Sequence, residues 1–528
     1  MRARRPNFLL ILTDQQRADH LGCAGAPGLP TPAIDGLARA GTRWTDCHVA
    51  TPICQPNRAS LLTGQLPSAH GVTMNGRELP LDAFSVAEAL RQAGWRTGLV
   101  GKAHWQNITP VPPSWPTPAQ RLAQQARDWG GPGHGQELAT RWADPAHELR
   151  CPYYGFEQVQ LSIGHGDQQS GHWRRWLLAQ DPQAESLLGP HNAWPTPDWA
   201  LPRIGQAWRT RLPVEWHPST WVAEQGERLL QQWAQAADGA PFFLQCSFAD
   251  PHHPFTPPGE HWSMLAPEDV VLPASFDAPL HRPPPPVQRL RQARRPEGFR
   301  PGYGSFAATE REVREAIALN HGNIALIDQA VGRLLAALDR LGLAEDTVVI
   351  FTSDHADLMG DRGLLFKGGL HYGALTRVPL IWRDPQAPGG QVCEGLAQST
   401  DVPVSMLARA GLPPVHGLHG RSLLAQLAQP QTALREGVLI EEESQRDDVG
   451  LGQRLRMRSW RTRTHRLTLW AGQPWGELVD LRNDPLELRN LWDEPSAQAL
   501  RADMTEQLAQ AMLAATDRKS TRLNSSHR

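Results

Sequence analysis

The chain has 528 residues, 40% of them hydrophobic, and a formal net charge of −2. A chain of this length can bury one large hydrophobic core and a smaller one. Its near-neutral charge gives no reason to expect nucleic acid or an anionic membrane surface as a partner. No apolar stretch approaches the length of a membrane-spanning helix. From the charge and from the apolar pattern together, we expect neither a nucleic-acid partner nor a membrane partner.

The cysteines and the N-terminus both indicate a cytoplasmic protein. The six cysteines (23, 47, 54, 151, 246 and 393) show no C-x-x-C spacing, which is the pattern of neither a disulfide framework nor a zinc site. Arginines at 2, 4 and 5 before the apolar run from Phe8 to Leu12 mimic a secretory signal. The run is too short for one, and cleavage there would remove Asp14. We therefore expect this run to be the first strand of a mature cytoplasmic protein.

Strands and helices are predicted to alternate along most of the chain. Apolar runs bounded by polar residues predict strands, and apolar residues at 3.6-residue spacing predict helices. The predicted order is strand 7–12, helix 86–93, strand 97–100, helix 224–237, strand 242–248, helix 312–341 and strand 347–352. This alternation favours an α/β fold, a large mostly parallel sheet with helices on both faces.

Other segments do not show this alternation of strands and long helices. Residues 105–215 are rich in Pro, Trp and Gly and predict a loop-rich insertion, and residues 273–303 are expected to be irregular. Beyond residue 400, short strands are predicted at 437–440, 454–458, 464–470 and 475–479. We therefore divide the chain into a catalytic domain (1–400), a C-terminal subdomain with a small antiparallel sheet (401–517) and a tail (518–528). The tail lacks an apolar pattern and resembles a non-native, adapter-derived extension.

Two predicted strands end in polar pairs. Asp14 and Gln15 follow the first strand, and Asp354 and His355 follow the strand that begins at Thr347. Ligands of parallel α/β sheets bind at the carboxyl ends of the strands. Each aspartate by itself could equally be a turn or helix-capping residue. The two pairs together predict a metal site.

The run CQPNRASLLTG, from Cys54 to Gly64, carries the strongest functional pattern. Pro56 suits the first turn of a short helix and Gly64 suits its end. Cys54 then lies at a helix N-terminus, where free N–H groups favour anions. A single cysteine there would more often be a small core residue. The whole run resembles the C-x-P-x-R-x-x-x-x-T-G signature of the sulfatase family. The resemblance implies that a maturation enzyme oxidises Cys54 to Cα-formylglycine, whose hydrate is the nucleophile.

Further motifs extend the resemblance. Lys102 and His104 match the sulfatase G-K-x-H pattern, His252 matches P-H-x-P, and Lys367 lies where the family has its second sulfate-binding lysine. Asn75 resembles an active-site asparagine of related hydrolases, although it would also suit a turn before Gly76. The resemblance implies that Lys102 and Lys367 contact the sulfate, and that Arg58, these two lysines and a divalent cation neutralise its negative charge. It also implies that His252 protonates the leaving oxygen, and that His104 assists release of sulfate.

The resemblance also implies one divalent cation, held by Asp14, Gln15, residue 54, Asp354 and His355. Many sulfatases have three carboxylates and one amide at this site. A glutamine and a histidine here make the pattern more similar to choline sulfatases and phosphonate monoester hydrolases. Hard oxygen ligands favour Ca²⁺, and the imidazole admits Mn²⁺.

The sequence therefore predicts an alkaline-phosphatase-like fold and hydrolysis of a sulfate ester to an alcohol and inorganic sulfate. One alternative is hydrolysis of a phosphonate monoester or phosphodiester at the same site, and another is a catalytically silent metal-binding protein. The expected partners are a small-molecule or saccharide sulfate ester and a formylglycine-generating enzyme. The pattern leaves open the alcohol, which segment 105–215 is expected to select, and the oligomeric state.

Overall fold

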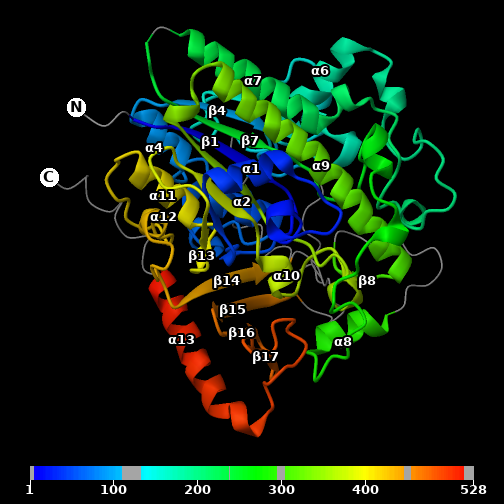
Figure 1. The fold of residues 1–528 in the computed structure, drawn as a ribbon, viewed down its shortest axis with the longest axis vertical. Coiled ribbons are helices and arrows are strands. Elements are labelled where there is room, and N and C mark those ends of the chain that lie inside the picture. The colour runs from blue at the N-terminus through cyan, green and yellow to red at the C-terminus, as the bar shows by residue number, and fades with distance from the viewer. Residues whose placement is uncertain (1–4, 110–132, 237, 294–303, 445–453, 517–528) are drawn as a thin grey trace.

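The computed structural model describes residues 5–109, 133–236, 238–293, 304–444 and 454–516 (Figure 1). Its centre is a nine-stranded sheet. In spatial order the strands are β12 (Gln391–Cys393), β2 (Thr42–Trp44), β11 (Leu380–Arg383), β9 (Thr347–Ser353), β1 (Asn7–Thr13), β7 (Phe242–Ser247), β4 (Arg96–Gly101), β5 (Gln158–Ile163) and β6 (Ser170–Gly171). The central run from β9 to β5 is parallel, whereas β11 is antiparallel to both of its neighbours and β6 is antiparallel to β5. The predicted mostly parallel sheet is confirmed.

Helices cover both faces of this sheet, because alternate side chains of each strand point to opposite sides. Leu9 and Ile11 of β1 pack into one core, and Phe8, Leu10 and Leu12 pack into the other. The first core is closed by α1 (Pro32–Ala40), α7 (Pro218–Gln235) and α9 (Glu310–Arg340). The second is closed by α2 (Cys54–Thr63), α4 (Val86–Gln92) and α11 (Asp401–Arg409). Figure 1 shows α7 and α9 side by side. Burial on both faces explains why β1 reads as an unbroken apolar run.

Helix α9 begins with a local sequence signal that favours a helix start. It spans 31 residues and begins with a capping box. Thr309 accepts a hydrogen bond from the Glu312 N–H, and the Glu312 carboxylate accepts one from the Thr309 N–H. This reciprocal pair satisfies two backbone donors that the first helical turn leaves unpaired. The predicted helix 312–341 is confirmed with a shift of one or two residues at its ends.

The C-terminal part carries a second, antiparallel sheet of β14 (Gly437–Glu443), β15 (Arg456–Thr462), β16 (His465–Trp470) and β17 (Gly476–Asp480). Helix α13 (Gln498–Thr516) covers one face through Met504 and Leu508. The other face packs Met457 and Trp470 against Tyr372. Helices α11 and α12 (Leu424–Ala428) instead pack into the core of the large sheet. The proposed division at residue 400 stays a prediction, and the tail 518–528 lies outside the described residues.

Two segments expected to be irregular contain regular structure. Segment 105–215, where it is described, contributes β5, β6 and α6 (His172–Gln180). Segment 273–303 contains α8 (Pro285–Gln292), whose prolines occupy the first turn, where a missing N–H is tolerated. The remaining elements are short: α3 (Pro67–His70), α10 (Gly373–Thr376), the paired β3 (Cys47–His48) and β13 (Ala397–Gln398), and the paired β8 (Phe306–Ala307) and β10 (Leu364–Leu365). In the described ranges, no helix is both long and apolar enough to cross a membrane.

Candidate active site

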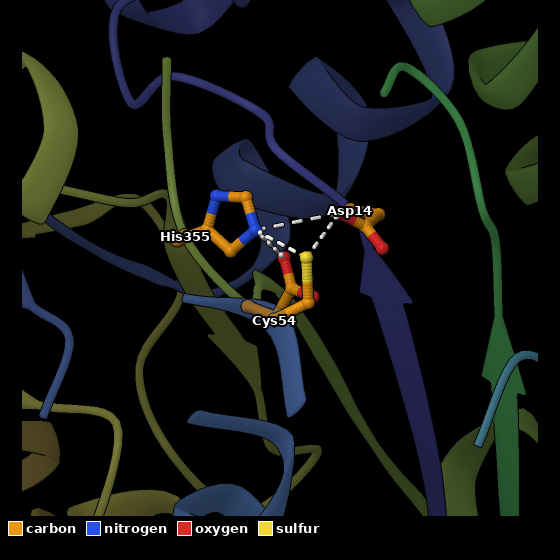
Figure 2. A group of neighbouring side chains, drawn as sticks. Asp14, Cys54 and His355 are labelled. Carbon is orange, nitrogen blue, oxygen red and sulfur yellow. Dashed lines mark hydrogen bonds and ion pairs between the residues drawn. The ribbon is translucent and has the colours of Figure 1, made fainter. Parts of the chain in front are cut away.

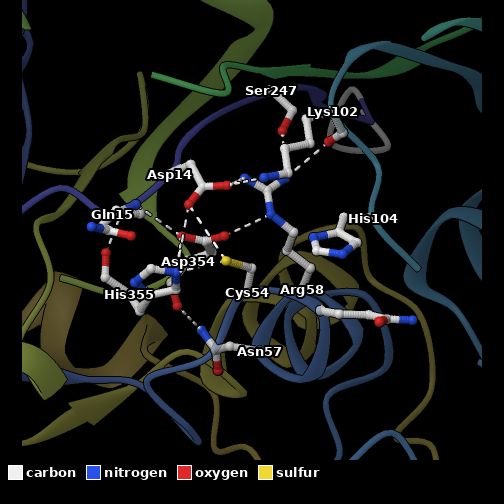
Figure 3. Close-up of polar contacts among 12 residues, drawn as sticks. Asp14, Gln15, Cys54, Asn57, Arg58, Lys102, His104, Ser247, Asp354 and His355 are labelled. Carbon is white, nitrogen blue, oxygen red and sulfur yellow. Dashed lines mark hydrogen bonds and ion pairs between the residues drawn. The ribbon is translucent and has the colours of Figure 1, made fainter. Parts of the chain in front are cut away.

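The predicted site residues converge at the carboxyl ends of the parallel strands. Asp14 follows β1, Asp354 and His355 follow β9, and Lys102 follows β4. Backbone hydrogen bonds hold these ends together: the Asp354 N–H donates to the Thr13 carbonyl at 3.1 Å. Figure 3 shows the resulting cluster around Cys54. The two polar pairs, far apart in sequence, are neighbours because β1 and β9 pair in register from Asn7 with Thr347 to Thr13 with Ser353.

Cys54 begins helix α2, all ten residues of which are buried. The helix ends at Gly64, whose φ of 70° is in the left-handed region that favours glycine. The Cys54 sulfur lies 3.0 Å from Nε2 of His355 and 3.7 Å from Oδ1 of Asp14 (Figure 2). Burial and Asp14 raise the pKa of this thiol, but Lys367 and His355 outweigh them, so the pKa lies below its ordinary value.

Arg58 lies one turn further along α2 and links four groups at the base of the site. Its Nε donates to Asp354 at 2.6 Å, and its Nη2 donates to Asp14 at 3.3 Å. Nη1 donates to the Lys102 carbonyl and to the Ser247 hydroxyl, both at 2.9 Å. Such a buried guanidinium fixes both carboxylates while leaving other lone pairs of each free to face the side chains around Cys54.

Asn57 and Asn75 hold the backbone around the site. The Asn57 amide donates to the Asp354 carbonyl, a contact that the sequence did not reveal. Asn75, predicted as an active-site residue, accepts a hydrogen bond from the Gln55 N–H at 3.1 Å. It therefore holds the first turn of α2, the turn that carries Cys54.

Four of the predicted metal-site residues can offer ligand atoms to one ion. The ligand atoms of Asp14, Cys54, Asp354 and His355 all lie within 4.8 Å of one another and are buried. Nδ1 of His355 donates to the Ala356 carbonyl at 2.9 Å, which leaves the Nε2 lone pair directed at the cluster. Burial raises the pKa of the Asp14 carboxyl, but Lys102 and Arg58 hold it well below its usual range. Two carboxylates, an imidazole and residue 54 form a donor set that fits a divalent cation.

Gln15, the fifth predicted ligand, lies beside this cluster in an unusual backbone conformation. Its φ is 65°, in the left-handed region. Its N–H donates to Oδ1 of Asp354 at 3.1 Å, and its side-chain Oε1 accepts a hydrogen bond from Lys367 at 2.6 Å. The amide oxygen therefore faces the side of the site where Lys367 and Cys54 meet.

Lys367 and His252 form a second group of side chains beside Cys54. The Lys367 ammonium lies 3.0 Å from the Cys54 sulfur and 2.8 Å from Nε2 of His252. Nδ1 of His252 donates to the His253 carbonyl, so its Nε2 is the acceptor for Lys367. Burial, then His165 and Lys367, hold the pKa of His252 well below its ordinary value. His252 is therefore neutral and placed to relay a proton from Lys367.

Lys102 contacts Asp14 and a residue that the sequence did not reveal, His165. Nε2 of His165 lies 2.6 Å from the Lys102 ammonium, and its ring stacks on His252 at 3.8 Å. His165 follows β5, inside the segment expected to be loops. The alternating run from Gln158 to Ile163 was the signal that could have placed it at a strand end.

His104 lies on the other side of Arg58 (Figure 3) and is held through its backbone. Its φ is 56°, and its N–H donates to Oε2 of Glu137, another residue that the sequence did not indicate. Oε1 of Glu137 accepts hydrogen bonds from the next two backbone N–H groups and from the Tyr153 hydroxyl. Burial, then Lys102 and Arg58, hold the pKa of His104 well below its ordinary value. Its buried Nδ1 has no hydrogen-bond partner in the described part of the chain, which leaves a ring nitrogen available for a substrate or water.

The site thus holds three buried cationic side chains before any metal binds. Arg58, Lys102 and Lys367 face the carboxylates of Asp14 and Asp354, and all five side chains are buried. Buried cationic side chains attract an anion and stabilise negative charge that develops on it. The geometry fits a nucleophile at residue 54 attacking a small oxyanion ester.

Comparisons with known proteins agree with this chemistry. A family profile described as Sulfatase matches residues 6–147 and 213–412, and one described as N-sulphoglucosamine sulphohydrolase, C-terminal, matches 360–514. The multifunctional alkaline phosphatase superfamily protein PehA of Trinickia caryophylli is 30% identical, over 99% of this chain and 98% of PehA. The choline-sulfatase of Rhizobium meliloti is 26% identical, over 95% of this chain and 85% of the relative. The crystal structure of the phosphonate monoester hydrolase of Agrobacterium radiobacter superposes with a TM-score of 0.74 at 26% identity, covering 97% of this chain and 96% of that one.

Proposed function

The chain belongs to the sulfatase family and is a sulfuric ester hydrolase, and we propose that its nucleophile is a formylglycine formed from Cys54. The observation that carries the proposal is the position of Cys54, at the buried N-terminus of α2 and 3.0 Å from both His355 and Lys367. A buried thiol at this point lies within reach of both a candidate cation ligand, His355, and a cationic side chain, Lys367. The proposed maturation partner is a formylglycine-generating enzyme.

Asp14, Gln15, Asp354 and His355 would hold a divalent cation, which would supply charge neutralisation, and a formylglycine hydrate at position 54 would supply the attacking hydroxyl. Lys102 and Lys367 bind the sulfate oxygens, and Arg58, whose N–H groups hold Asp14 and Asp354, adds to the positive charge that stabilises the negative charge growing on the sulfate. Their burial keeps this electrostatic stabilisation strong, because little water screens it.

Two neutral imidazoles, those of His252 and His104, transfer protons at different steps of the reaction. His252 first accepts a proton on Nε2 from the Lys367 ammonium, 2.8 Å away, and then passes that proton to the departing alcohol oxygen. His104 takes the proton that residue 54 releases as sulfate leaves. His165 holds the Lys102 amine and stacks on His252, so it joins the sulfate-binding side to the leaving-group side.

We propose Ca²⁺ as the cation, with Mn²⁺ as the alternative. Support for Ca²⁺ comes from the oxygen ligands of Asp14, Gln15 and Asp354, and support for Mn²⁺ comes from the His355 imidazole. The proposed substrate is a small-molecule or saccharide sulfate ester. The choline-sulfatase relative supports the first class, and the sulphoglucosamine sulphohydrolase profile supports the second.

Hydrolysis of a phosphonate monoester or phosphodiester is a second candidate, favoured by the similarity to the phosphonate monoester hydrolase structure. A sulfate monoester and a phosphodiester each carry one negative charge, so the cationic side chains of Arg58, Lys102 and Lys367 suit both. The pair Lys102 and His104 resembles the sulfatase pattern more closely, which is why sulfate is preferred here.

A side-by-side rate comparison tests the order of preference. The protein is produced together with a formylglycine-generating enzyme, and kcat/KM is measured on an aryl sulfate, choline sulfate, the matched aryl phosphodiester and a phosphonate monoester. Cys54→Ala is the control for contaminating hydrolases. We expect the sulfate to be preferred. A preference for the diester of more than about tenfold, roughly 1.4 kcal/mol of transition-state stabilisation, would replace the sulfatase proposal with the second candidate.

A cytoplasmic location is also proposed, supported by the free state of all six cysteines in the structure. Fractionation of the producing cells checks it, with recovery of the protein in an extracellular or periplasmic fraction as the contrary result.

A further inference from the structure

We propose that Asp357 is a positioning residue that fixes the orientation of the Gln15 amide, so that the oxygen of that amide faces the cation site. The inference rests on the proposed function, in which Gln15 is a cation ligand. Asp357 is fully buried and lies three residues after Asp354. No motif of the sequence pointed to it.

The Asp357 carboxylate uses its two oxygens for two different tasks. Oδ2 accepts a hydrogen bond from Nε2 of Gln15. Oδ1 accepts hydrogen bonds from the backbone N–H groups of Met359, at 2.8 Å, and Phe366, at 2.9 Å. Phe366 has a φ of 70° and directly precedes Lys367. One carboxylate therefore holds both the Gln15 side chain and the turn that delivers Lys367.

The two ends of a glutamine amide have nearly the same shape but opposite chemistry. Only the oxygen can coordinate a cation, and the NH₂ group can only donate hydrogen bonds. An ionised carboxylate accepts and never donates, so Asp357 selects the NH₂ end of Gln15. Nδ1 of His253, 3.0 Å from Nε2, is a second atom on that side. On the other side the Lys367 ammonium, which only donates, lies 2.6 Å from Oε1. In a flipped amide, the NH₂ group would face the Lys367 ammonium, donor against donor. The amide oxygen would face the Asp357 carboxylate, acceptor against acceptor.

The same contact explains why an amide suits position 15 here. A carboxylate at position 15 would also offer oxygen to the cation, but it would meet the buried Asp357 carboxylate at hydrogen-bond distance. Two buried like charges in contact are strongly disfavoured. Gln15 and Asp357 are therefore a matched pair, and the polarity of their hydrogen bond should be reversible by changing both.

Asp357→Asn isolates the contact with Gln15. The substituted side chain keeps an oxygen for the Met359 and Phe366 N–H groups, and places an NH₂ group against Gln15. The Gln15 amide then turns its oxygen toward that NH₂ group and its own NH₂ group toward the cation site. Loss of a partner that orients a metal ligand typically weakens metal affinity by about 10- to 100-fold, and we expect a weakening of Ca²⁺ binding in that range.

The double variant Gln15→Glu with Asp357→Asn reverses the polarity of the contact. The NH₂ group of the introduced asparagine donates to one oxygen of the introduced glutamate, and the other oxygen faces the cation whichever way the side chain turns. We expect Ca²⁺ affinity to return to within about threefold of the wild type, a difference below about 1 kcal/mol by the relation of affinity to free energy. If Asp357→Asn alone does not fold, the double variant is still predicted to fold and bind.

The experiment measures the Ca²⁺ dissociation constant of the full-length chain by calorimetry for the wild type, Asp357→Asn and the double variant. Asp384→Asn is the matched control, because Asp384 is also buried but binds Arg409. It should lower the thermal unfolding temperature without changing Ca²⁺ affinity. Wild-type affinity in Asp357→Asn overturns the inference, and so does failure of the double variant to recover. Those outcomes leave the proposed function intact, because the wild type is assayed separately for Ca²⁺ binding and for turnover of an aryl sulfate.

Discussion

Changing Glu137 to Gln should displace His104 and slow catalysis. The Glu137 carboxylate is buried and accepts four hydrogen bonds. Oε2 accepts from the His104 N–H, while Oε1 accepts from Trp105 at 2.9 Å, from Gln106 at 3.0 Å and from the Tyr153 hydroxyl at 2.7 Å. A glutamine can keep its oxygen toward the three donors on one side. Its NH₂ group then faces the His104 N–H, donor against donor.

The size of the effect follows from this geometry. A buried donor left without an acceptor costs about 1–3 kcal/mol, so the free energy of unfolding should fall by about that amount. A positioned general acid or base contributes about 10²- to 10⁴-fold to a rate. Because Glu137→Gln moves His104 without removing it, we expect kcat on an aryl sulfate to fall by at least about tenfold.

Tyr153→Phe is the matched control. It removes one hydrogen bond to Oε1 and leaves the His104 N–H paired with Oε2. The free energy of unfolding should fall by about 1 kcal/mol, while kcat stays within about twofold of the wild type. Both variants are measured by chemical unfolding and by kcat at saturating substrate. Full kcat in Glu137→Gln, or an equal loss of kcat in the two variants, would refute the reasoning.

Three further predictions concern the nucleophile and the cation. In the protein made with a maturation enzyme, peptide mass across Cys54 should show the aldehyde or its hydrate in place of the thiol, and full activity with an unmodified cysteine would contradict the mechanism. Asp354→Ala should abolish Ca²⁺ binding measured by calorimetry and reduce kcat/KM by at least about 10²-fold, since it removes a ligand and the partner of Arg58; full Ca²⁺ binding would remove Asp354 from the site. In the protein with unmodified Cys54, Ca²⁺ affinity should weaken as the pH falls: burial lowers the pKa of His355, but Asp354 and Cys54 more than offset it, so the net pKa lies above its ordinary value. Because only the neutral imidazole coordinates, the weakening should begin above about pH 6.5. In the cation-free protein the sign is opposite, since the stability from protonated His355 is complete below its unfolded pKa and is lost as the pH rises through the raised one. Calorimetric Ca²⁺ titrations across this range check the first trend, thermal unfolding checks the second, and an affinity independent of pH would contradict the role of His355.

The sequence by itself determined the parts of this protein that depend on local pattern. The apolar runs before Asp14 and Asp354 predicted two parallel strands, and the strands deliver these carboxylates to one edge of the sheet. The run from Cys54 to Gly64 predicted a short helix with the cysteine at its start, which the structure has. Such features are readable because strand periodicity, helix ends and turn residues are set by neighbours in the chain.

Only the tertiary structure decided which side chains support those residues. Strand β5 brings His165 onto His252, and the carboxylates of Glu137 and Asp357 hold His104 and Gln15. Asp357 and Gln15 are 342 positions apart in the sequence, and the contact exists only after β1 and β9 have paired. A buried carboxylate that accepts backbone and amide N–H groups has no local signature, because the donors that it satisfies come from distant turns. The chemistry of the site is therefore written in short motifs, whereas its orientation is fixed by long-range hydrogen bonds that form only in the folded core.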